Sequence, residues 1–192
     1  MKKLILAASL ALASLAAQAT VINFNGYQNT IYGDENVANG LEVVSTQGFQ
    51  FFSSGDHFHF VDLSSYGGPS NGTSVLMEDR DFTITMKTDN NSKFDFLSML
   101  ASGFGSSGTL SITGYNNAGS VNASLNVNNN GFTSTTLTGF TGLSRVVFSG
   151  SRSLSFSIDN LEVAASKVPE PASLSLLLLG VAGLALGRKR RA

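Results

Sequence analysis

Few side chains in this 192-residue chain could perform catalysis or bind a metal. There is no cysteine, which excludes a thiol nucleophile, a thiolate metal site and a disulfide scaffold. The two histidines, His57 and His59, alternate with phenylalanines in a predicted strand, so they share one face and could ligate a metal. They lack a clear third ligand, and a solvated histidine pair on a strand is the alternative.

Carboxylates are concentrated in Glu78-Asp79-Arg80-Asp81, beside a predicted strand. Two carboxylates that face each other across a cleft can hydrolyse a glycosidic bond. Neighbours in one short segment rarely do so, and a loop with a local ion pair to Arg80 fits better. Residues 102–108 lack the Gly-Lys-Ser/Thr of a phosphate loop, and no G-x-S-x-G elbow is present. We predict a noncatalytic protein, with a secreted hydrolase as the alternative.

Ligand binding by aromatic side chains would depend on tyrosines, because the chain has no tryptophan. A tyrosine can stack on a sugar ring and also offer a hydroxyl. Four tyrosines lie beside Gly or Asn in predicted loops, where recognition residues are common. Tyrosines that only cap the ends of the fold are the alternative. The four are Tyr27, Tyr32, Tyr66 and Tyr115.

The elements that would position these residues are strands. Gly, Ser, Thr and Asn make up nearly half of residues 20–168, yet all 14 phenylalanines also lie there and can form a core. Alternation of apolar and polar residues predicts strands, each with one buried and one wet face, at residues 82–86, 110–112, 121–127 and 154–158. Further strands are predicted at residues 21–24, 48–52, 57–63, 93–100 and 145–148. We predict an all-β fold, an antiparallel β-sandwich of jelly-roll type, with another Greek key as the alternative.

Two local features refine this prediction. Residues 110–112 and 121–127, on either side of the turn cluster 116–119, predict a β-hairpin. In the last strand the apolar parity changes at Asp159-Asn160, which indicates a β-bulge. Asp159 is the best candidate for a calcium ligand, because calcium prefers carboxylate and carbonyl oxygens. A carboxylate that hydrogen-bonds the bulge backbone is the alternative.

The charge of the body differs from that of the whole chain. Residues 20–168 hold 6 basic and 12 acidic side chains, a net charge of −6. This balance argues against a nucleic-acid partner bound through a basic patch.

The first 19 residues are typical of a secretory signal peptide. Lys2 and Lys3 precede an apolar run of 12 residues, and Ala17 and Ala19 form an A-x-A site, so we predict cleavage after Ala19 by the secretion machinery. A membrane anchor is the alternative, but 12 residues cannot cross a hydrocarbon core of roughly 30 Å.

The last residues, 168–192, follow the domain at 20–167 and combine three parts. Pro169-Glu170-Pro171 cannot continue a helix and stays extended and accessible. Residues 172–187 are uncharged and predict a short transmembrane helix of about 24 Å, which needs flanking residues or local thinning of the bilayer. The basic tail Arg188-Lys189-Arg190-Arg191 would hold the C-terminus in the cytoplasm. A buried helix is the alternative for residues 172–187, and a proline-rich linker ahead of an anchor is the alternative for Pro169-Glu170-Pro171.

These three parts, in this order, resemble the PEP-CTERM sorting signal. The resemblance implies a substrate of an exosortase, a membrane-embedded transpeptidase-like enzyme that processes the signal near Pro169-Glu170-Pro171. Proteins with this signal are exported by Gram-negative bacteria that often make exopolysaccharide. We therefore expect a body in the periplasm, anchored in the inner membrane, that later reaches the cell surface or extracellular matrix.

The two ends of the body resemble the first and last strands of jelly-roll carbohydrate-binding modules. The similar segments are residues 22–26 and 156–163. In those modules the two strands pair and their acidic residues often hold a structural calcium; Asn25 stands where an acidic residue is usual. The resemblance implies a calcium site at Asp159 and Asn25 and association with exopolysaccharide or envelope components. A structural or adhesive protein that binds another protein or itself is the alternative.

Overall fold

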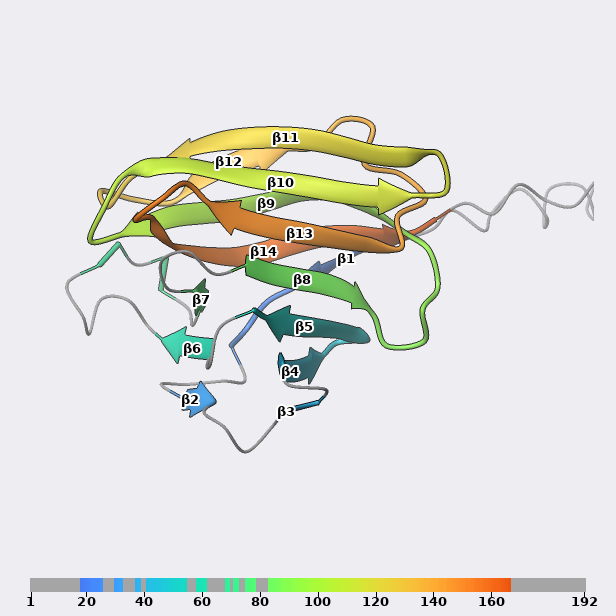
Figure 1. Cartoon of the computed structure of the whole chain (residues 1–192), viewed down its shortest axis with the longest axis horizontal. Coiled ribbons are helices and arrows are strands. Elements are labelled where there is room, and N and C mark those ends of the chain that lie inside the picture. The colour runs from blue at the N-terminus through green and yellow to red at the C-terminus, as the bar shows by residue number, and fades with distance from the viewer. Residues whose placement is uncertain are drawn as a thin grey trace, which may run out of the picture.

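We analysed a computed structural model of the chain, shown in Figure 1. It describes residues 18–25, 30–32, 37–38, 41–54, 58–61, 68–69, 71–72, 75–78 and 83–166. These residues form fourteen strands and no helix. Accordingly, no helix in this part of the chain is long and apolar enough to cross a membrane. Most of the predicted signal peptide and the whole sorting segment, residues 168–192, lie outside the described residues.

The strands form two antiparallel sheets, which we call sheet A and sheet B; sheet B lies in front of sheet A in Figure 1. Sheet A has the order β12 (Thr133–Thr136), β9 (Phe94–Phe104), β14 (Ser155–Ala165), β7 (Val75–Glu78), β6 (Phe58–Val61), β2 (Thr30–Tyr32), and β1 (Ala19–Ile22) pairs with β14. Sheet B has the order β11 (Gly119–Val127), β10 (Gly108–Asn116), β13 (Arg145–Gly150), β8 (Thr83–Thr88), β5 (Phe49–Ser53), β4 (Leu41–Thr46), β3 (Val37–Ala38). The prediction of an all-β antiparallel sandwich is therefore confirmed.

Phenylalanines fill the space between the sheets. Phe96 of β9 meets Phe148 of β13 with ring centroids 5.9 Å apart and ring planes at 89°. Phe94 of β9 meets Phe49 of β5 at 5.2 Å and 88°. Each pair joins sheet A to sheet B in the edge-to-face geometry that aromatic rings prefer. The core that the sequence predicts from its phenylalanines is thus the layer that joins the two sheets.

The last strand, β14, contains the predicted bulge. Its register against β9 shifts between Asp159, opposite Leu100, and Glu162, opposite Ser98, and Asn160 has a φ of 48°. One expectation for this strand is wrong, because Ser155, Ser157 and Asp159 are buried and no wet face exists there. The physical reason is that β14 lies in the middle of sheet A; Ser157 bonds to Ser102 of the neighbouring strand β9, and Asp159 accepts a hydrogen bond from Asn71.

The predicted hairpin is present as β10 and β11, which pair in unbroken register from Asn116 opposite Gly119 to Gly108 opposite Val127. Asn116 Oδ1 accepts a hydrogen bond from the Ala118 N–H at 2.9 Å and so closes the two-residue turn. Five strands were not predicted, namely β2, β3, β4, β7 and β12. They are short or lack a clear apolar alternation, and pairing within the sheets holds them in place.

Candidate functional site

The two predicted calcium ligands lie in different environments. Asp159 is fully buried, and its Oδ2 accepts a hydrogen bond from Asn71 Nδ2 at 2.6 Å. Asn25 is exposed in a turn after β1, and its N–H donates to Asn23 Oδ1 at 3.4 Å. The strands themselves pair as the resemblance implies, with Ile22 of β1 opposite Leu161 of β14. Calcium binding by Asp159 and Asn25 stays a prediction.

The tyrosines do not gather at one site. Tyr115 is the second-last residue of β10, opposite Ser120 and Arg145, so its predicted loop position is wrong. The reason is that the β10–β11 hairpin continues almost to its turn. Tyr32 is the last residue of strand β2 and does not lie in a loop. Tyr27 and Tyr66 lie outside the described residues. Sugar binding by these four tyrosines stays a prediction.

The other polar candidates are only partly described. His59 lies in β6 opposite Met77, while His57 is outside the described residues. Glu78 ends β7, and the rest of its acidic cluster, residues 79–81, is likewise not described. Among the residues that the structure does describe, no group of three or more His, Cys, Asp or Glu side chains could hold a metal ion.

The outer face of sheet B is a broad surface built by the described residues, and we call it the platform. Its side chains lie in rows across the strands, because each antiparallel register brings equivalent residues opposite each other. One row crosses six strands, from β4 to β11: Val43, Phe52, Thr85, Val147, Thr113 and Asn122. A second, shorter row holds Thr83, Ser149, Ser111 and Ser124. The platform therefore combines hydroxyl, amide and aromatic groups with two valines, Val43 and Val147.

Two aromatic rings on the platform each contact a cation. Arg145 lies over the ring of Tyr115, with its guanidinium carbon 4.1 Å from the ring centroid. Lys87 Nζ lies 4.8 Å from the centroid of Phe52. Among the described side chains of the platform, Lys87 and Arg145 are the only charged ones. A face with two cations thus stands on a body whose net charge is −6.

Hydrogen bonds hold the polar groups of the platform in place. Thr113 Oγ1 donates to Asn122 Oδ1 at 2.9 Å, and Thr109 Oγ1 donates to Asn126 Oδ1 at 3.1 Å. Each bond joins neighbouring strands of the hairpin and orients an amide whose NH₂ group is still available as a donor. Such an array can hydrogen-bond an extended polar polymer without large rearrangement.

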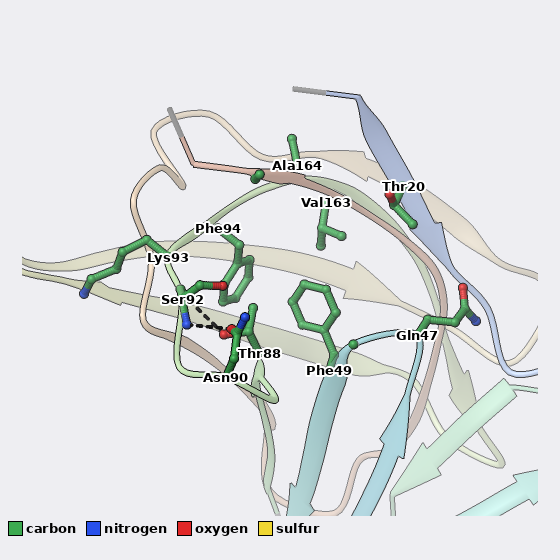
Figure 2. A pocket seen from close by; sticks show the side chains of 12 residues that line it. Thr20, Gln47, Phe49, Thr88, Asn90, Ser92, Lys93, Phe94, Val163 and Ala164 are labelled. Carbon is green, nitrogen blue, oxygen red and sulfur yellow. Dashed lines mark hydrogen bonds between the residues drawn. The ribbon is translucent and has the colours of Figure 1, made fainter. Parts of the chain in front are cut away.

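A second feature is a hollow of about 220 Å³ at the end of the sandwich where β14 ends (Figure 2). Thr20, the turn at Gln47, the β8–β9 loop and the end of β14 line it. Some of its polar groups bond to each other: Thr88 Oγ1 donates to the Ser92 carbonyl at 2.8 Å, and the Ser92 N–H donates to Asn90 Oδ1 at 3.0 Å. The hollow is smaller than the roughly 300–1,000 Å³ of typical small-molecule sites.

Sequence reasoning did not single out Phe52, Lys87 or Arg145. Alternation in each strand indicates which residues point outward, but not which strands are neighbours. Residues 52, 87 and 145 share one face of sheet B through pairings between distant segments, β5 with β8 and β8 with β13. The one sequence signal that could have pointed to Lys87 and Arg145 was a positive charge at an outward position of a strand.

Comparison with solved structures returns carbohydrate-binding modules, the class that the end strands resemble. A family 29 module is 14% identical and covers 84% of this chain and 96% of its own, with a TM-score of 0.40. TmCBM61, solved with β-1,4-galactotriose, is 9% identical and covers 70% and 86%, with a TM-score of 0.37. A family 11 module from Clostridium thermocellum, solved with a β-1,3-1,4-mixed-linked tetrasaccharide, is 9% identical and covers 79% and 98%, with a TM-score of 0.36. Because these scores lie below 0.5, we take the fold from the sheets themselves.

Comparison with curated proteins returns no match. Comparison with family models gives one match, at residues 167–191, to the PEP-CTERM protein-sorting motif. This confirms the resemblance that the prolines, the apolar stretch and the basic tail indicate. The motif implies export and membrane anchoring before processing by an exosortase. The chain therefore carries the sorting signal of an exported protein.

Proposed function

We propose that this protein is a noncatalytic surface or matrix protein, sorted by an exosortase, whose jelly-roll body binds an acidic exopolysaccharide on the platform. The platform carries this proposal: six strands present hydroxyls, amides and two aromatic rings, and Lys87 and Arg145 supply its only charges among the described side chains. Sugar hydroxyls would bond to the Thr and Asn groups. Polymer carboxylates would pair with the two cations.

The spacing of the two cation–aromatic pairs suits a polymer rather than a single sugar. Phe52 and Tyr115 lie three strands apart in sheet B and are offset by two residues along the strands. Strands are roughly 4.8 Å apart and two residues rise roughly 7 Å, so the Cα atoms of Phe52 and Tyr115 are about 16 Å apart. A chain of several sugars would be needed to reach both. Because the body as a whole has a net charge of −6, it would repel an anionic ligand elsewhere, and binding would depend on Lys87 and Arg145.

The test is retention of the full-length mature protein, purified from a producing culture, on acidic and on neutral polysaccharide. Arg145→Ala and Lys87→Ala should each remove one ion pair with a carboxylate of the polysaccharide. A surface ion pair is worth about 0.2–1 kcal/mol, so the Kd should rise by up to roughly fivefold. The matched control is Arg152→Ala, because Arg152 is an exposed cation in the β13–β14 turn, off the platform. Equal losses in Arg145→Ala and Arg152→Ala, or no retention of a folded sample, would contradict the proposal.

Sorting can be tested separately from binding. Replacing Pro169, Glu170 and Pro171 with alanines should leave an unprocessed precursor anchored through residues 172–187. The readout is the mass of the chain in the membrane and medium fractions. Release of the variant with the same mature C-terminus as the wild type would show that this segment is not the processing signal.

A further inference from the structure

Among the described residues, strand β11 forms an edge of sheet B that has none of the usual protection against pairing with another chain. Native edge strands are commonly short, bulged, or interrupted by charged residues or proline. β11 has nine residues, GSVNASLNV, without a charge or a proline, and its register against β10 is continuous. It is therefore a long, regular template for a further strand.

The backbone of β11 offers hydrogen bonds outward from this edge. The two-residue turn makes Asn116 and Gly119 a hydrogen-bonded pair, so alternate residues from Ser120 onward direct their N–H and C=O away from β10. The side chains of Asn122 and Asn126 do not cover the edge, because they accept bonds from Thr113 and Thr109 across the platform. The outward row of backbone groups thus remains available to a partner strand.

The inner face of β11 is incompletely covered. Val121, Ala123 and Leu125 pack against the core but are only partly buried. The strand that ends sheet A on this side, β12, has only four residues. An additional strand beside β11 would bring further apolar side chains next to Val121 and Leu125 and remove more of their surface from water.

We propose that this edge binds a second copy of the chain, with the two β11 strands antiparallel and related by a two-fold axis at Ala123. Ala123 is the middle residue of β11, so this register pairs all nine residues. It sets Val121 opposite Leu125 of the second copy on the inner face, and Asn122 opposite Ser124 on the outer face. The strand is thus complementary to itself, as a two-fold interface requires. It also carries no charge that would repel its own copy.

A cysteine cross-link tests this register, since the chain has no cysteine of its own. The two Ala123 residues would form a non-hydrogen-bonded pair with Cα atoms about 4.5 Å apart. This distance lies within the range that a disulfide spans. In the full chain, exported into an oxidising compartment, Ala123→Cys should give a disulfide-linked dimer on a non-reducing gel.

The matched control is Leu125→Cys, on the same face of the same strand. The two Leu125 residues would be offset by four residues, about 13 Å, and should give only monomer. Adding Ser124→Pro to Ala123→Cys removes an outward N–H without breaking a bond to β10, and should abolish the cross-link while the melting temperature stays close to that of Ala123→Cys. Absence of a cross-link in Ala123→Cys, equal cross-linking of the Leu125→Cys variant, or a cross-link that survives Ser124→Pro would each overturn the proposal.

Discussion

Substitution of Gly103 tests how closely the backbone of β9 packs against neighbouring segments of the sandwich. Gly103 lies near the end of β9, opposite Phe156 of β14, and its N–H donates to the Asn128 carbonyl at 3.0 Å. A Cβ added here would collide with the carbonyl oxygen of Ser106 and lie 3.3 Å from the carbonyl carbon of Asn128. Both neighbours are backbone, so no side-chain rotation can relieve the contact. Gly103→Ala must displace the β9–β10 turn or the segment at Asn128.

The expected cost follows from these contacts. Overpacking of a well-packed site costs about 1–3 kcal/mol, and the hydrogen bond to Asn128, if lost, contributes about 1 kcal/mol more. We therefore expect Gly103→Ala to lower the free energy of unfolding by about 2–4 kcal/mol. For a domain of roughly 150 residues this corresponds to a fall in melting temperature of roughly 6–12 °C.

Thermal unfolding followed by circular dichroism measures this difference, and Gly131→Ala is the matched control. A Cβ at Gly131 meets no atom within 4 Å, and its backbone φ is not in the left-handed region. That variant should melt close to wild type, or be stabilised by up to about 1 kcal/mol because alanine restricts the unfolded chain. If the two variants melt within about 2 °C of each other, the close approach of β9 to residues 106 and 128 is wrong.

Three further outcomes are expected. Asn71→Ala should lower the free energy of unfolding by about 1.5–3 kcal/mol, because it removes a donor to the buried Asp159 carboxyl. If calcium raises the melting temperature of the wild-type protein but not that of Asp159→Asn, Asp159 belongs to the predicted calcium site. Phe96→Ala should cost about 3–5 kcal/mol in denaturant unfolding, because the ring joins the two sheets and is fully buried. Arg145→Ala should change stability by at most about 1 kcal/mol, since its contact with Tyr115 is at the surface. A larger loss would mean that its effect on polysaccharide retention reflects unfolding.

The features predicted correctly from sequence are those that depend on near neighbours. The hairpin around residues 116–119 combines two alternating strands with a turn rich in Asn and Gly, and both signals are local. The bulge at Asp159-Asn160 was visible because the apolar parity of one strand changes there. The sorting segment was recognisable because its three parts follow each other directly.

The features that were missed depend on contacts between distant segments. β12, with the sequence TSTT, has no apolar residue, and only its pairing with β9 makes it a strand. Ser102 and Ser157 are fully buried and their hydroxyls bond at 2.6 Å, although the alternation in its strand predicts a solvent-exposed position for Ser157. Their burial is decided by the position of β14 within sheet A. The platform likewise requires the registers of six strands, which the composition of any one strand does not contain.

The edge and the platform are physically linked, because the two-fold axis proposed at Ala123 runs perpendicular to sheet B. Antiparallel pairing about such an axis keeps Asn122 and Ser124 of both copies on the same face of the joined sheet. The two platforms would therefore form one surface with β11 and its copy at the centre.

A polymer long enough to cross both copies would make its second contact intramolecularly, which raises its avidity beyond the affinity of one platform. By thermodynamic reciprocity the same polymer must also favour the dimer. Cross-linking of Ala123→Cys at low protein concentration should then increase with long acidic polysaccharide and not with short oligosaccharides of the same composition. Equal cross-linking with both would separate dimer formation from polysaccharide binding.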